Sequence, residues 1–251
     1  MSVVVKLGGS TVADEAWLCE LGRAIAGSER PVVVVHGGGP EVSELSAALG
    51  VATKFVEGRR VTPPAALDVA AMVLTGRVNK RIVRALRSAG VDAFGVSGED
   101  GGLVSARVAA GGALGRVGEV AGVRGELLEW LLARGLVPVI SPISASSGGE
   151  ALNVNADEVA AAVAVAIGAD ELLFLTGVEG VLTEAGRAAQ LTLEESVQLM
   201  ESGVVRDGMR VKVEASLRAL EQGVASVRIG GPAMLSEAAA GTRVGALGVA
   251  A

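Results

Sequence analysis

Residues 32–42 read VVVVHGGGPEV, and this stretch decides the fold. Four consecutive β-branched valines favour a buried strand, and the three glycines after His36 permit a tight turn. Pro40 suits the first turn of a helix, and Val42, Leu45 and Leu49 then recur at helical spacing. The stretch therefore predicts a strand, a glycine turn and a helix, which together make one βα unit.

The same alternation extends along the chain in both directions. Residues 3–7 form a second short β-branched run, which Gly8-Gly9 follows, and residues 14–26 carry apolar side chains at helical spacing. We predict further strands at residues 91–96, 103–108, 137–143, 171–175, 226–229 and 242–244, and further helices at residues 39–49, 63–75, 78–89, 126–134, 156–167, 192–201 and 209–221. Such alternation predicts one largely parallel sheet covered by helices on both faces.

One segment departs from this pattern. In residues 53–62, TKFVEGRRVT, the pair Glu57-Gly58 lies between two short extended pieces and predicts a β-hairpin. We find neither an internal repeat nor a linker. One continuous sheet is therefore favoured over two separate domains, with a soft division into two lobes near residues 145–170.

Composition excludes several classes of protein. The 251 residues carry a formal charge of −6 and no basic run, which argues against nucleic acid or an anionic membrane surface as a partner. No apolar run reaches the roughly 18 residues of a membrane span. Cys19 is the single cysteine and cannot form an internal disulfide. We expect it to be a small buried residue on a helix in a reducing cytoplasm.

Two glycine turns, Gly8-Gly9 and Gly37–Gly39, follow the first two predicted strands. Ligands of such sheets bind at the carboxyl ends of the strands, and glycine lets backbone N–H groups approach an anion closely. The alternative is that these glycines only make tight βα turns. The spacing matches neither the dinucleotide-binding fingerprint nor the P-loop.

Three charged residues require explanation. Lys6 ends a buried strand, so its ammonium must either find a partner or reach the surface. Asp157 precedes the alanine-rich helix and has the position of an N-cap, and Lys212 on its own would be a solvated helix residue. A functional role for these residues is indicated only when the three are considered together.

Nine stretches, taken in order, resemble those of one known family. They are KLGGS (6–10), VHGGGPEV (35–42), EGRRVT (57–62), GRVNK (76–80), VSGEDG (96–101), LGRVG (114–118), ALNVNADE (151–158), LTGVEGVL (175–182) and GVVRDGMRVKV (203–213). Across essentially its whole length the chain resembles the amino-acid kinase superfamily and, within it, the acetylglutamate kinases. KLGG alone indicates only the superfamily, whereas GRRVT, LNVNAD and DGM-x-x-K together indicate the acetylglutamate family.

The resemblance implies transfer of the γ-phosphoryl group of ATP to the side-chain carboxylate of N-acetyl-L-glutamate. The product would be N-acetyl-L-glutamyl 5-phosphate, made for arginine biosynthesis. It also implies a three-layer α/β/α sandwich with a mainly parallel open central sheet. Residues 1–155 would bind the acyl amino acid and dimerise, and residues 156–251 would bind ATP, with Mg²⁺ held mainly through the ATP phosphates.

The resemblance assigns roles to individual residues. Lys6 and Lys212 match the two catalytic lysines, and Asp157 matches the aspartate that orients them. The acetylglutamate ligands would be Gly38, Gly39, Arg60 and Asn153; the ATP site would contain Gly8, Gly9, Gly177, Val178, Glu179, Gly180, Val181, Leu182, Val204, Val205 and Arg206. Gly177 stands where relatives commonly have Asp or Asn. Arg59 stands where relatives often have an apolar residue, and receives no role.

The chemistry is consistent with this composition, because a carboxylate is already ionised at neutral pH and its phosphorylation needs no general base. His36, the only histidine, is therefore expected to be structural. Two rivals stay open: a kinase for carrier-protein-linked aminoadipate or glutamate, and a non-catalytic sensor of acyl amino acids. Because the first strand begins near Val3, without a preceding helix, we expect a homodimer that arginine does not inhibit.

Overall fold

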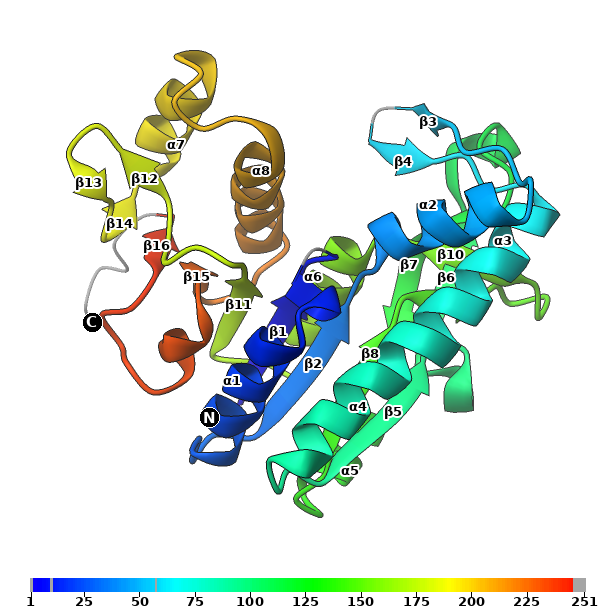
Figure 1. Ribbon diagram of the computed structural model, residues 1–251, viewed down its shortest axis with the longest axis horizontal. Coiled ribbons are helices and arrows are strands. Elements are labelled where there is room, and N and C mark those ends of the chain that lie inside the picture. The colour runs from blue at the N-terminus through cyan, green and yellow to red at the C-terminus, as the bar shows by residue number, and fades with distance from the viewer. Residues whose placement is uncertain (1, 10, 57, 246–251) are drawn as a thin grey trace.

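The computed structural model describes residues 2–9, 11–56 and 58–245 (Figure 1). Ser10 and Glu57, which belong to two of the motifs quoted above, lie outside the described residues. Within these ranges no helix is long and apolar enough to cross a membrane.

An eight-stranded sheet forms the centre of the molecule. In spatial order its strands are β14 (Gln190–Leu191), β16 (Thr242–Val244), β15 (Val227–Gly230), β11 (Glu171–Leu175), β1 (Val3–Leu7), β2 (Val32–His36), β8 (Val137–Ser141) and β5 (Ala93–Ser97). All neighbouring strands are parallel except β15 and β16. The largely parallel sheet predicted from the βα alternation is therefore confirmed.

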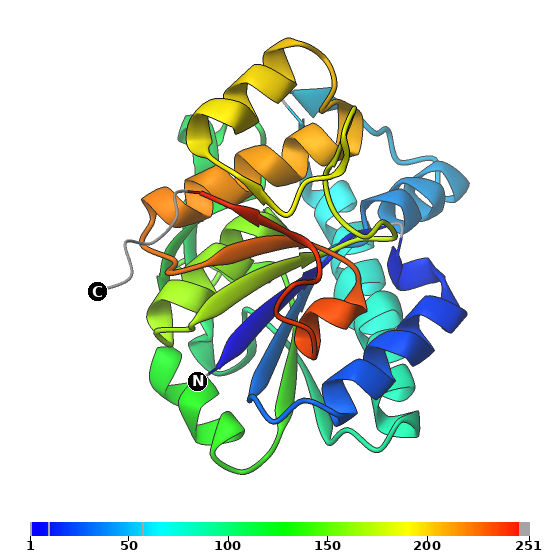
Figure 2. The same cartoon turned by 90° about the vertical axis from the view of Figure 1, so that its left-hand side faces the viewer.

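Helices cover both faces of this sheet (Figure 2). One layer contains α1 (Glu15–Ala26), α2 (Gly39–Ala48), α3 (Pro64–Ala71), the π-helical η2 (Met72–Val78) and α4 (Asn79–Ser88). The other contains α5 (Gly125–Leu132), α6 (Ala156–Ala166) and α8 (Asp207–Glu221), and α7 (Leu193–Glu201) packs beside α8. The three-layer α/β/α sandwich is thus the observed architecture.

Strand β1 shows why both faces are apolar. Val3, Val5 and Leu7 belong to the core under α1 and α4, whereas Val4 belongs to the core under α6 and α8. Successive strand residues point to opposite faces, so Lys6 lies on the same face as Val4. Its ammonium group is thereby directed to the side of the sheet that α6 covers.

A second, smaller sheet was not predicted. Strands β10 (Ala151–Val154), β7 (Val117–Val123), β6 (Val104–Val108) and β9 (Ile143–Ala145) close into a four-stranded barrel. The prediction of one continuous sheet was therefore wrong at residues 103–108, which lie in the barrel. It was also wrong at residues 137–143, because that run divides at Pro142 into β8 and β9.

Two smaller expectations also changed. The helices predicted at residues 63–75 and 78–89 join without interruption through η2. Cys19 lies on α1 as expected, but it is exposed. The inward face of that helix is made by Leu18, Leu21 and Ile25. Cys19 follows Leu18 by one residue, about 100° further around the helix, and so faces solvent.

The remaining pairings are two short hairpins. Strands β3 (Phe55–Val56) and β4 (Arg59–Arg60) confirm the hairpin predicted in residues 53–62, and β12 (Leu182–Thr183) pairs with β13 (Gly186–Arg187). The four described 3₁₀ turns are η1 (Thr11–Ala13), η3 (Asp100–Gly102), η4 (Ala109–Gly112) and η5 (Pro232–Leu235).

Arg228 on β15 forms a buried ion pair with Glu171 on the neighbouring strand β11 and also holds the segment that follows β15. Arg228 donates two hydrogen bonds to Glu171, at 2.6 and 2.8 Å, and both side chains are almost fully buried. The same guanidinium also donates to the carbonyls of Met234, Glu237 and Ala240. These bonds satisfy a charge that would otherwise be strongly destabilising in the interior.

Candidate active site

The two glycine turns predicted at the carboxyl ends of β1 and β2 lie against each other. A Cβ atom on Gly9 would lie 2.8 Å from Cδ of Pro40, and one on Gly38 would lie 2.8 Å from Cδ2 of Leu74. Both distances are shorter than any van der Waals contact. At Gly9 a Cβ would also lie 3.3 Å from the backbone nitrogen of Gly39, so the close approach of the two turns favours glycine there. A Cβ at Gly38, in contrast, would displace the end of the Leu74 side chain.

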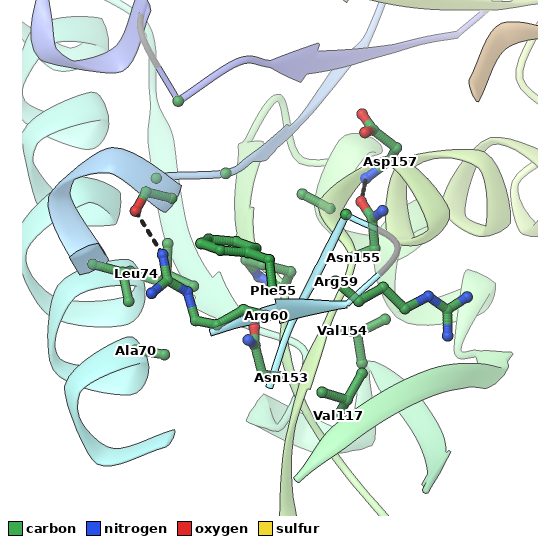
Figure 3. Close-up of a pocket in the computed structure, with 18 of the residues that line it drawn as sticks. Phe55, Arg59, Arg60, Ala70, Leu74, Val117, Asn153, Val154, Asn155 and Asp157 are labelled. Atoms are coloured by element: carbon green, nitrogen blue, oxygen red, sulfur yellow. Dashed lines mark hydrogen bonds between the residues drawn. The ribbon is translucent and has the colours of Figure 1, made fainter. Parts of the chain in front are cut away.

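A cavity of about 370 Å³ opens beside these turns (Figure 3). Seven of the residues proposed from the sequence line it, and they are Lys6, Gly9, Gly38, Gly39, Arg60, Asn153 and Asp157. Residues more than a hundred positions apart in the chain thus meet at one site. The cavity also has an apolar side that the motifs did not indicate, made by Ala70, Leu74, Val117 and Val154.

Lys6 and Asp157, which both line this cavity, form an ion pair. The Nζ–Oδ1 distance is 2.7 Å, and the two side chains are only 13% and 14% exposed. Asp157 lies in the first turn of α6, which covers the face of β1 that carries Lys6. Lys6 therefore reaches a buried partner and does not extend to the surface.

The N-cap assigned to Asp157 was wrong. The N-cap of α6 is Asn155, whose side-chain Oδ1 accepts a hydrogen bond of 2.8 Å from the backbone N–H of Asp157. Because Asn155 satisfies the helix end, the Asp157 carboxylate is left to face Lys6. Asn155 also lines the cavity, and the N-x-D spacing before an apolar helix was the signal that could have identified this cap.

Lys212 approaches the same ion pair from α8. Its Nζ donates to the carbonyl of Gly208 at 3.1 Å. Burial lowers the pKa of Lys212, and the positive charge of Lys6 lowers it further, while Asp157 partly opposes both effects. Lys212 does not line the cavity, but its neighbour Val211 does. The two lysines are thus near enough to influence each other's charge.

Arg60 projects from β4 towards the glycine turn (Figure 3). Its Nη2 atom donates to the carbonyl of Gly39 at 3.0 Å and to Oγ of Ser43 at 2.6 Å, and its guanidinium lies over the ring of Phe55. Among the described residues no carboxylate forms an ion pair with Arg60. Burial lowers the pKa of this guanidinium.

Asn153 lies on β10, across the cavity from the glycine turns. Its side-chain amide donates to Oγ1 of Thr62 at 3.3 Å. Thr62 follows the hairpin directly, and its backbone N–H donates to the carbonyl of Leu114 at 2.9 Å. Asn153 and the end of the hairpin are therefore fixed to the same wall of the barrel.

The two stretches predicted to bind ATP lie outside this cavity. Residues 177–182 follow β11, and residues 204–206 lead into α8, of which Arg206 is the N-cap. Val204 and Thr183, which follows Leu182, line a separate cavity of about 640 Å³. A Cβ on Gly177 would meet no atom within 4 Å, so packing does not require glycine there.

His36 is completely buried at the end of β2. Its Nδ1–H donates to the carbonyl of Gly37 at 2.9 Å, and its Nε2 accepts from Nδ2 of Asn79 at 3.2 Å. Burial lowers the pKa of His36 from 6.5 to about 4, and the charges of Lys80 and Lys6 act in the same direction. A neutral ring that joins the glycine turn to α4 is the structural role expected from the sequence.

Comparison with known sequences shows the family to which this chain belongs. Residues 1–231 match the model of the Amino acid kinase family, and the chain belongs to that family. Within it, the chain is 45% identical over 231 residues to the acetylglutamate kinase of Geobacillus stearothermophilus, covering 91% of this chain and 89% of the relative. It is 43% identical over 234 residues to the acetylglutamate kinase of Prochlorococcus marinus (strain NATL2A), covering 90% and 77%.

A solved structure shares the architecture along nearly its whole length. The protein smu.665 from Streptococcus mutans UA159 superimposes with a TM-score of 0.82 at 28% identity, covering 98% of both chains. The barrel and the central sheet together are therefore a fold that this chain has in common with an independently determined structure.

The single histidine makes the state of His36 directly measurable. We expect its ring C–H resonance, followed by NMR, to remain that of a neutral ring from neutral pH down through 6.5 and to shift only near 4. The pKa of His36 is lower in the folded than in the unfolded protein. The contribution of its neutral ring to the free energy of unfolding is therefore complete above pH 6.5 and is lost as the pH falls towards 4. It amounts to about 3 kcal/mol. A midpoint close to 6.5 in the folded protein would contradict the buried, neutral assignment.

Proposed function

We propose that this chain transfers the γ-phosphoryl group of ATP to the side-chain carboxylate of N-acetyl-L-glutamate and forms N-acetyl-L-glutamyl 5-phosphate. The observation that carries the proposal is the largely buried Lys6–Asp157 pair, which lines a cavity walled by glycine turns and Arg60. The relatives named acetylglutamate kinase support this choice of substrate. The product is the intermediate expected for arginine biosynthesis.

The reaction requires little covalent chemistry from the protein itself. A carboxylate oxygen of the substrate forms a bond to the γ-phosphorus, and the bond from that phosphorus to the bridging oxygen of ADP breaks. The nucleophile is already ionised, so no proton is transferred and no general base is needed. Catalysis then consists of in-line positioning and stabilisation of the charge that spreads over the transferring group.

The two lysines supply that positive charge from the face of the sheet that α6 and α8 cover. Lys6 acts from β1, where Asp157 holds its ammonium in place, and Lys212 acts from α8. The backbone N–H groups of Gly8 and Gly9 add donors beside the phosphates. The field is local, because the chain as a whole carries a charge of −6 and would repel two anionic substrates.

Arg60 and Asn153 bind the acyl amino acid together with Gly38 and Gly39. The planar guanidinium of Arg60 can hold a carboxylate through two parallel hydrogen bonds, which a lysine cannot. Its contact with Gly39 supports a role for the hairpin as a lid on the substrate. The apolar wall at Ala70 and Leu74 suits the methylene and acetyl groups.

The nucleotide would occupy the other lobe. Residues 204–206 lead directly into the amino end of α8, which also carries Lys212, so a phosphate chain held there would extend towards that lysine. Mg²⁺ would be bound mainly by the ATP phosphates. Residues 1–155 and 156–251 would accordingly form an acyl-amino-acid lobe and an ATP lobe of a single kinase domain, working in the cytoplasm.

A hydroxamate assay tests the proposed substrate. Purified protein, MgATP and hydroxylamine are incubated with N-acetyl-L-glutamate, L-glutamate or a carrier-protein-linked aminoadipate, and the acyl phosphate is trapped as its hydroxamate. We expect product with N-acetyl-L-glutamate. Product only with the carrier-linked substrate would select the rival kinase, and none with any substrate would select a non-catalytic sensor.

The lysines can be tested in the same assay. Lys6→Ala and Lys212→Ala are each expected to lower kcat at least about a hundredfold, since each removes a charge that stabilises the transition state. Arg210→Ala is the matched control. It lies on the same helix as Lys212 and forms an exposed pair with Glu214 at 2.9 Å. An unchanged kcat in either lysine variant would remove that residue from the mechanism.

We also propose that the chain works as a homodimer. β5 is an edge strand of the central sheet, and the side chain of Phe94 on it is 45% exposed. Light scattering is expected to give twice the mass of the chain, and millimolar arginine is expected to leave the activity unchanged. A hexamer, or inhibition by arginine, would contradict this expectation.

A further inference from the structure

The two adjacent arginines of β4 fasten the hairpin to opposite walls of the cavity (Figure 3). Arg60 reaches the amino end of α2, where it contacts Gly39 and Ser43. Arg59 extends the other way and pairs with Glu119 of β7 at 3.3 Å. Neighbouring strand residues point to opposite faces, so this division follows from their positions in β4.

Glu119 has two partners, one on each carboxylate oxygen. Its Oε1 atom binds Arg59, and its Oε2 atom binds Nη2 of Arg107 on β6 at 3.3 Å. The contact with Arg107 joins two strands of the barrel that are already paired along their length. The contact with Arg59 joins the barrel to the hairpin. Only the contact between Glu119 and Arg59 therefore affects where β4 lies.

The contacts of Arg60 cannot all persist when substrate binds. Its Nη2 atom is occupied by Gly39 and Ser43, and its Nη1 atom donates to Oγ1 of Thr53 at 3.2 Å. To hold a carboxylate with two parallel hydrogen bonds, the guanidinium has to release at least part of this set. β4 then loses part of its attachment to α2 at the moment when Arg60 must be held in position.

The remaining attachments of the hairpin are few. Strands β3 and β4 pair over only two residues each, and a two-stranded ladder of that length is marginal by itself. The backbone bonds between Thr62 and the Leu114–Arg116 segment fix the end of the hairpin at Thr62. Beyond that point, the ion pair between Arg59 and Glu119 joins β4 to the barrel.

We propose that Arg59 is a positioning residue that, through Glu119, holds β4 against the barrel while Arg60 turns from α2 to the carboxylate of the substrate. This inference rests on the proposed function and assigns a role to a residue that the resemblance left without one. Both side chains are partly exposed, 39% for Arg59 and 30% for Glu119, so the effect is modest and falls on substrate affinity.

The test compares Arg59→Gln, Glu119→Gln and the double variant with the wild type. Each single change is expected to raise KM for N-acetyl-L-glutamate about two- to fivefold, with kcat and KM for ATP unchanged. The double variant should raise KM no more than either single one, because all three lack the same contact. Hydrogen exchange of the β3 and β4 amides in the substrate-free protein should be faster in all three variants.

Arg107→Gln is the matched control, since it removes an ion pair with the same glutamate but not the link to the hairpin. Its KM and its hairpin exchange should equal those of the wild type. Equal effects of Arg107→Gln and Arg59→Gln, additive effects in the double variant, or a change in kcat or in KM for ATP would overturn the proposal. An inactive wild type would instead refute the proposed function, and the exchange measurement would still decide the role of Arg59.

Discussion

The ion pair between Lys6 and Asp157 is the interaction on which the rest of the structure depends. A lysine that ends a buried strand is unfavourable unless a carboxylate meets it, and Asp157 does so at 2.7 Å. This contact requires α6 to begin directly above the carboxyl end of β1, with Asn155 capping the helix so that the aspartate is left free to face the lysine. The same geometry places the ammonium group of Lys6 beside the glycine turns that line the cavity. The ion pair that offsets the cost of burying most of Lys6 thus also holds its ammonium group at the candidate site.

Packing against neighbouring side chains fixes the position of the glycine turns. Gly9 and Gly38 each lie so close to a neighbouring side chain that any Cβ atom would clash. On the far side, Leu74 of the π-helical segment η2 presses on Gly38 and also lines the cavity. Glu41, in the first turn of α2, accepts two hydrogen bonds from Arg81 of α4, at 2.7 and 2.9 Å, and these lower its pKa. The amides that would face an anion are therefore part of a rigid wall.

The opposite wall is the small barrel, and the hairpin spans the two. Arg60 is attached to the rigid wall through Gly39 and Ser43, and Arg59 to the barrel through Glu119. Such an arrangement lets one arginine exchange partners while the other keeps the strand in place. It also concentrates cationic side chains at one opening of a protein whose formal charge is −6. Steering of anionic substrates then depends on this local field, which salt screens, and not on net charge.

The sequence by itself determined the parallel sheet, its two glycine turns and the hairpin, because a β-branched run, a turn and an apolar helical face are each patterns of contiguous residues. The set of candidate residues came from the resemblance of its motifs to a known family. The sequence did not reveal the barrel. Residues 103–108 were predicted as a strand, but no local pattern showed how it would pair: β7 pairs with β10 from more than thirty residues away. The exposure of Cys19, the cap at Asn155 and the partner of Arg59 were likewise decided by which faces pack together. Tertiary structure alone brought Lys6, Asp157 and Lys212 to one place, because long-range packing fixes the spatial position of residues distant in the chain.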